Sequence, residues 1–156
     1  MGPANDIRAL SIDQQIDRMC AEYPLLYLLH ATEWGVVWQG GIRPLAQTYD
    51  VQIHYCAFRL DIANIEARTV HVESVSPELR HRSDANIPHV YPNRVKPTRP
   101  RLCLHMRHEW DASLYIADTI VPWTAEWLVA YEGWRATGKW FAGGHNTARP
   151  AAQVGR

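Results

Sequence analysis

Five prolines fall between residues 76 and 100, and this stretch most constrains how the chain can fold. Proline lacks a backbone N–H and fixes φ, so helix interiors and central strands exclude it. We therefore expect a long loop here, between a strand-patterned half and a helix-patterned half of the chain. No repeat or second domain is visible, so we expect one domain over residues 1–156, with a core at about 6–140 and a tail at 141–156.

Before the loop, the periodicity predicts one helix followed by strands. Residues 6–23 repeat apolar side chains at helical spacing as far as Pro24, and residues 25–30 could form a short further turn. β-Forming or alternating patterns predict strands over the residue ranges 34–39, 49–56 and 68–75.

After the loop, the pattern becomes helical. Asp111 can cap a short helix that runs to about Asp118, and Pro122 suits the start of another helix. In that second helix an aromatic stripe recurs at helical spacing, and we assign to the core its members Trp123, Trp127, Tyr131 and Trp134. The order of elements is typical of an α+β fold.

Cys103 directly follows the loop, in the sequence Arg101-Leu102-Cys103-Leu104-His105. If Leu102 and Leu104 point inward on an extended segment, the two-residue period turns Cys103 outward with its cationic neighbours. A thiolate is the reactive form of cysteine, and nearby positive charge favours it. We therefore expect an accessible, reactive thiol. The alternative is a buried, inert cysteine.

The other two cysteines, Cys20 and Cys56, fall within a helix pattern and a strand pattern, where packing roles are expected. An odd number of cysteines without a close pair does not suggest a disulfide framework. The chain also lacks a secretory segment and an apolar run of transmembrane length. These features predict a cytoplasmic protein without a membrane partner.

Basic residues are concentrated between Arg80 and Arg107, where Asp84 is the one acidic residue. Such a run is either a solvated loop or a surface for a partner. The formal net charge of the chain is zero, which argues against a nucleic-acid surface. Cys103, His105 and His108 lack a fourth ligand at zinc-site spacing, so we expect neither a metal nor another cofactor.

Several local motifs occur in the order found in one known family. Gly40-Gly41-Ile42-Arg43-Pro44 looks like the turn after that family's first strand, and His89-Val90-Tyr91-Pro92-Asn93 looks like its histidine-proline-asparagine stretch. Leu102-Cys103-Leu104 matches the active-site core, and Trp110 matches the tryptophan that follows. Over roughly residues 6–140 the chain resembles ubiquitin-conjugating enzymes.

The sequence departs from the motif of ubiquitin-conjugating enzymes at two points. Tyr91 stands where the family motif has histidine, and Asn93 lies about two residues farther from the cysteine than usual. With its aromatic C-terminal helix, the chain is similar to the divergent bacterial branch that is encoded beside cGAS-like nucleotidyltransferases in antiphage (CBASS) operons.

The resemblance implies an α+β fold with an N-terminal helix, an antiparallel β-meander, an active-site loop and C-terminal helices. It implies that Cys103 carries the C-terminus of a cGAS-like nucleotidyltransferase, or of another ubiquitin-like or protein partner, as a thioester and passes it to an amine. The candidates for assisting Cys103 are His89, Asn93 and His105.

The excess of positive charge suggests that Arg94, Arg99 and Arg101 bind an acidic partner tail. A different class of function also remains open: a catalytically silent member of the fold that serves as a binding or scaffold protein for an operon partner.

Overall fold

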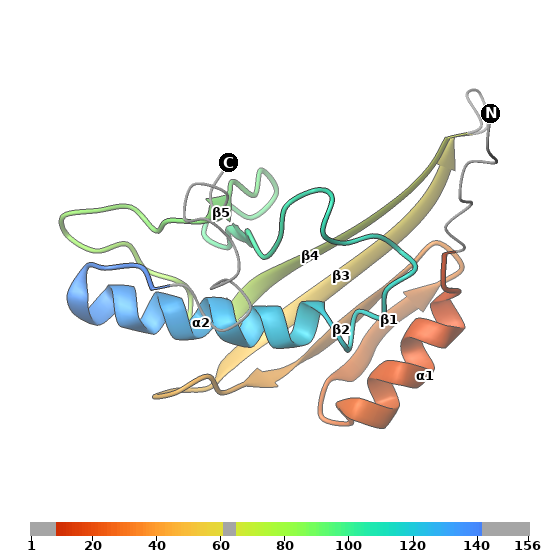
Figure 1. The fold of residues 1–156 in the computed structure, drawn as a ribbon, viewed down its shortest axis with the longest axis horizontal. Helices are drawn as coiled ribbons and strands as arrows, with labels where there is room; N and C mark the ends of the chain where they lie inside the picture. Colours follow the sequence, from red (N-terminus) through yellow and green to blue (C-terminus); the bar gives the residue numbers. More distant parts are fainter. Residues whose placement is uncertain (1–8, 61–64, 142–156) are drawn as a thin grey trace.

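The computed structural model describes residues 9–60 and 65–141, which form the expected α+β fold (Figure 1). In chain order the elements are α1 (Ile12–Glu22), β1 (Tyr27–Thr32), β2 (Gly35–Ile42), β3 (Tyr49–Leu60), β4 (Ile65–Ser76), β5 (Val90–Tyr91), β6 (Arg101–Leu102) and α2 (Ile120–Thr137). The strands of the described residues form one antiparallel sheet in the order β1-β2-β3-β4-β6-β5.

The core lies between one face of the sheet and α2, which crosses that face in Figure 1. The aromatic stripe of α2 belongs to the core as expected, because Trp127, Tyr131 and Trp134 are buried and Trp123 is partly buried. Tyr131 packs edge-on against Tyr49 of β3, with 6.2 Å between ring centroids. This aromatic contact ties the C-terminal helix to the meander.

Helix α1 begins later than the sequence pattern predicts. Ser11 and Gln14 form a capping box that starts the helix at Ile12, and residues 6–8 lie outside the described residues. The buried Gln15 side chain donates to Leu114 O and accepts from Ile116 N, both at 2.9 Å. These two bonds join α1 to the segment that precedes α2.

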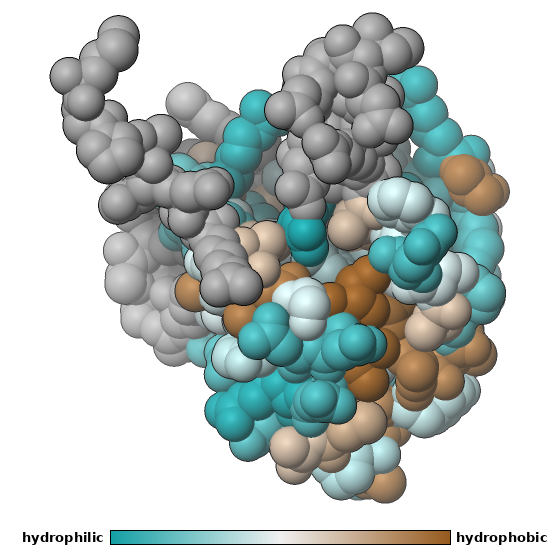
Figure 2. Space-filling model, turned by 90° about the vertical axis from the view of Figure 1, so that its right-hand side faces the viewer, coloured by the Kyte–Doolittle hydropathy of each residue, from teal (hydrophilic) through white to brown (hydrophobic). Residues whose placement is uncertain are grey.

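Strand β1 forms where the sequence suggested a further helical turn. It pairs antiparallel with β2, and all six of its residues are exposed. An edge strand that is exposed on both faces has no alternation of burial to reveal it in the sequence. Exposed apolar side chains lie in β1 and next to it in sequence (Leu25, Tyr27, Leu28, Leu29 and Trp34). Figure 2, which views this end of the molecule, shows apolar and polar surface side by side.

The turn expected over Gly40-Gly41-Ile42-Arg43-Pro44 begins only after Ile42, because both glycines lie inside β2. Gly40 instead allows a close approach of the chain before β1: a Cβ atom there would lie 2.5 Å from Leu25 O. The connection between β2 and β3 comes later, at residues 43–48.

The short helix expected from Asp111 to Asp118 is also wrong. Residues 111–118 form turns, and the Asp111 carboxylate accepts hydrogen bonds from the backbone N–H (2.8 Å) and the hydroxyl of Ser113. Asp111 thus closes a local turn instead of capping a helix. Within the described residues, one helix follows the cysteine where two were expected.

The other face of the sheet carries polar side chains. His54 of β3 lies directly opposite His71 of β4, and their rings stack with 4.5 Å between centroids. Burial, followed by the positive charges of His54 and Arg101, lowers the pKa of His71 to about 4. None of the helices in the described residues combines the length and the apolar character needed to cross a membrane.

Two glycine substitutions should have opposite effects on stability. Gly40→Ala should lower the free energy of unfolding by about 1–3 kcal/mol, because the new methyl group overlaps the Leu25 carbonyl. Gly133→Ala in α2 should raise it by about 0.5–1 kcal/mol, since among the described residues its Cβ meets only the Phe141 side chain, at 3.8 Å. Urea denaturation of both variants checks the pair. An unchanged free energy of unfolding in Gly40→Ala would contradict the close approach of the Leu25 carbonyl to Gly40.

Acid should destabilise the protein partly through His71. In the unfolded chain His71 binds a proton near the ordinary histidine pKa, whereas in the folded state its pKa is about 4. The folded state therefore loses stability as pH falls from about 6.5 to about 4. Replacing His71 by Gln should reduce this loss, as measured by thermal unfolding at a series of pH values. An identical pH dependence in wild type and His71→Gln would contradict the assignment.

Candidate active site around Cys103

Two short strands place Cys103 at the edge of the sheet. β5 and β6 pair antiparallel, with Val90 opposite Leu102 and Tyr91 opposite Arg101. One further backbone bond continues this pairing, from Cys103 N–H to His89 O at 2.9 Å. The cysteine backbone is therefore held by the hairpin, just beyond the end of β6.

The structure reverses the expected exposure of the three thiols. Cys103 is buried, with 4% of its surface exposed, whereas Cys20 and Cys56 are exposed. Leu102 and Leu104 are buried, as the alternation predicts. The prediction of an accessible Cys103 is wrong because alternation sets the face of a side chain and not what covers it.

Tyr91 is the residue that contacts the thiol. Its hydroxyl oxygen lies 3.1 Å from Cys103 Sγ. The hydrogen bond to Cys103, followed by burial, raises the pKa of Tyr91 to about 12, so the phenol stays protonated near neutral pH. A hydroxyl can accept from a thiol or donate to a thiolate. The sequence assigned Tyr91 no role, although its place in the histidine position of the motif was a signal.

Asn93 organises the loop. Its buried side-chain N–H groups donate to Glu73 Oε2 and to Arg99 O, both at 2.9 Å. Its Oδ1 accepts from the backbone N–H groups of Val95 (3.1 Å) and Lys96 (3.0 Å). Both ends of the amide are engaged away from the thiol.

His89 lies against the C-terminal helix region. It has a positive φ of 54°, and its carbonyl accepts from both Cys103 N–H and Trp127 Nε1–H. Its ring is 4.9 Å from that of Trp140, and burial lowers the pKa of the imidazole. Within the described residues, the buried Nδ1 has no hydrogen-bond partner.

His105 also packs among tryptophans. Its ring centroid lies 6.1 Å from that of Trp110 and 5.7 Å from that of Trp123, and Nδ1 is 2.8 Å from Met106 O. These contacts account for the orientation of the ring.

The three arginines assigned to partner binding differ in exposure. Arg94 is exposed, whereas Arg99 and Arg101 are half-buried, and Arg99 lies 3.8 Å from the buried Glu73 carboxylate. Arg101 helps to line a surface depression of about 330 Å³ beside the thiol, together with Val70, His71, Tyr91, Pro92, Leu102, Leu104, His105 and Arg107. The residues that line the depression include more basic than acidic side chains, so the depression is basic.

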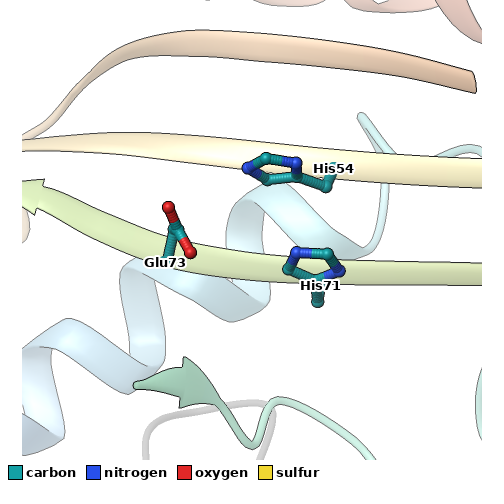
Figure 3. A group of neighbouring side chains, drawn as sticks. All are labelled: His54, His71 and Glu73. Carbon is teal, nitrogen blue, oxygen red and sulfur yellow. The ribbon is translucent and has the colours of Figure 1, made fainter. Parts of the chain in front are cut away.

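One group among the described residues has a donor set that suits a metal ion. His54, His71 and Glu73 converge on the polar face of the sheet, with their ligand atoms within 4.8 Å of one another (Figure 3). Two imidazoles and a carboxylate can bind zinc. However, Lys96 and Arg99 lie 3.6 and 3.8 Å from the same carboxylate, and their charge opposes a cation there. We assign Glu73, which accepts a hydrogen bond from Asn93, to the support of the loop.

Comparison with known proteins completes the description of the site. A family model described as Type II CBASS E2 protein matches residues 15–147, which include most of α1, the whole sheet, Cys103 and α2. A search of curated proteins found no match. The family match spans most of the chain and agrees with the motif order around Cys103. The chain therefore belongs to the family of type II CBASS E2 proteins, with an E2-like role in CBASS antiphage defence.

Proposed function

We propose that this protein is a ubiquitin-conjugating-like transferase that holds the C-terminus of a partner protein as a thioester on Cys103. The observation that carries the proposal is the setting of this cysteine. Its backbone is fixed by the hairpin, and its Sγ lies 3.1 Å from a hydroxyl group. A basic depression lies beside it. Family membership supports conjugation as the chemistry of such a thiol.

The proposed reaction has two acyl-transfer steps. The Cys103 thiol loses its proton to solvent, and Sγ attacks the carbonyl carbon of an activated C-terminus, either a thioester or an acyl adenylate. A C–S bond to Cys103 forms, and the bond to the previous thiolate or to AMP breaks, so that this group leaves with the electron pair. An amine then attacks the Cys103 thioester, so that a C–N bond forms and the C–S bond breaks. The electron pair remains on Sγ, and the amine proton passes to solvent. Cysteine suits both steps because it is a good nucleophile and a good leaving group.

The proposed partner is a cGAS-like nucleotidyltransferase, whose modification would regulate antiphage defence in the cytoplasm. An acidic tail on that partner would fit the basic loop at residues 94–101. Arg94 is the exposed arginine of this loop that a partner can reach, whereas Lys96 lies 3.6 Å from the Glu73 carboxylate. Arg99 is turned toward the buried Glu73 and holds the loop in place.

A second candidate is a binding or scaffold protein that does not use its thiol. One observation favours it: Cys103 is buried in the resting structure, with 4% of its surface exposed. Transfer requires that this cover opens, whereas scaffolding does not.

Thioester formation provides the direct test. A synthetic α-thioester of the nucleotidyltransferase C-terminal peptide should acylate a Cys20→Ser/Cys56→Ser variant, because Cys103 is then its remaining thiol. Intact-mass measurement should show an adduct that disappears with excess thiol. Adding Cys103→Ala to this variant should abolish the adduct. Tight binding of the peptide without formation of an adduct would support the scaffold function. An adduct that persists in Cys103→Ala would support it as well.

Partner affinity should depend on the exposed end of the loop. Arg94→Glu should weaken binding of the nucleotidyltransferase about three- to tenfold at low salt, and the difference should shrink at high salt. Arg43→Glu is the matched control, since Arg43 is an exposed arginine between β2 and β3. Titration calorimetry at two salt concentrations measures both variants. If Arg94→Glu and wild type bound the nucleotidyltransferase with equal affinity, the loop would not be part of the interface.

A further inference from the structure

We infer that Tyr91 is a catalytic residue of this site: its hydroxyl shields the Cys103 thiol at rest and donates a hydrogen bond to the thiolate as it leaves the thioester. The second part of this inference rests on the proposed thioester chemistry. The first part, the cover over the thiol, rests on the structure of the resting protein.

The positions of the other candidates support this assignment. Asn93 uses its amide within the loop, in bonds to Glu73 and to three backbone groups. His89 places its ring against Trp140. Tyr91 is the side chain whose hydrogen bond to Sγ the structure shows.

The register of the hairpin explains how Tyr91 reaches the sulfur. Tyr91 lies opposite Arg101 on the neighbouring strand, and Cys103 is two residues farther along the chain. Diagonal neighbours of this kind lie on one face of a sheet, within reach of an aromatic side chain. Tyr91 is 42% exposed and Cys103 is 4% exposed, so the ring lies on the solvent side of the thiol.

The Tyr91 hydroxyl should affect the charging of Cys103 and the discharge of the thioester to different extents. A donor that stabilises the thiolate makes Sγ a better leaving group but a weaker nucleophile. In the resting protein the hydrogen bond to Cys103, followed by burial, raises the pKa of Tyr91 to about 12, so the phenol carries its proton near neutral pH. Tyr91 therefore donates a hydrogen bond without losing its proton. Discharge of the thioester to an amine should gain more from Tyr91 than charging does.

Single-turnover kinetics of the Cys20→Ser/Cys56→Ser protein test the catalytic part. Tyr91→Phe keeps the ring and removes the donor. It should slow discharge to an added amine at least tenfold, while charging changes less than about threefold and Tm stays the same. Tyr91→His, which restores a donor, should recover part of the rate. Equal discharge in Tyr91→Phe and wild type, or an equal loss in both steps with a lower Tm, would overturn the catalytic role.

Alkylation of the uncharged protein tests the cover separately. Tyr91→Ala should let iodoacetamide react with Cys103 at least tenfold faster than in wild type, as followed by peptide mass mapping. The control is Tyr27→Ala, which removes a tyrosine of similar exposure from β1 and should change nothing. An unchanged rate in Tyr91→Ala would overturn the cover. If the wild-type protein forms no thioester, the thioester proposal and the catalytic role of Tyr91 both fail. The alkylation rate would still show whether Tyr91 shields the Cys103 thiol.

Discussion

A buried carboxylate connects the sheet to the loop that precedes the thiol. Glu73 of β4 is 2% exposed, accepts a hydrogen bond from Asn93, and lies 3.6 and 3.8 Å from Lys96 and Arg99. A carboxylate at this depth requires such partners, because an unpaired buried charge is strongly destabilising. β5 and β6 each have two residues, too few to hold a hairpin alone. The position of Cys103 therefore depends on Glu73 and on the loop that it binds.

This arrangement separates two roles within one short motif. Asn93 takes the structural role, since its amide bonds hold the loop on Glu73. Tyr91, two residues earlier, contacts the sulfur. The resemblance to ubiquitin-conjugating enzymes made Asn93 a candidate for assisting Cys103. In this chain the geometry favours support of the loop, and the larger separation of Asn93 from Cys103 in sequence agrees with it.

The errors of sequence reasoning have a common origin. Strand β1 shows no alternation because both of its faces are exposed, and Gly40 resembles a bend although it serves a close backbone approach. The alternation around Cys103 places Leu102 and Leu104 inward, as observed. It contains no information about the ring of Tyr91, which reaches Sγ from the neighbouring strand. In each case the deciding contact comes from another element.

The sequence by itself determined the α+β class, the proline-rich connection between β4 and β6 (though not the two-residue strand β5 within it), the aromatic core stripe of α2 and the place of the cysteine directly after that connection. These features are local, because proline chemistry and apolar periodicity act within one element. The tertiary structure alone decided that Cys103 is buried, that Tyr91 is its partner and that Glu73 anchors Asn93. These contacts join residues 12 and 20 positions apart. They depend on strand register and on what packs above each face, which no single segment encodes.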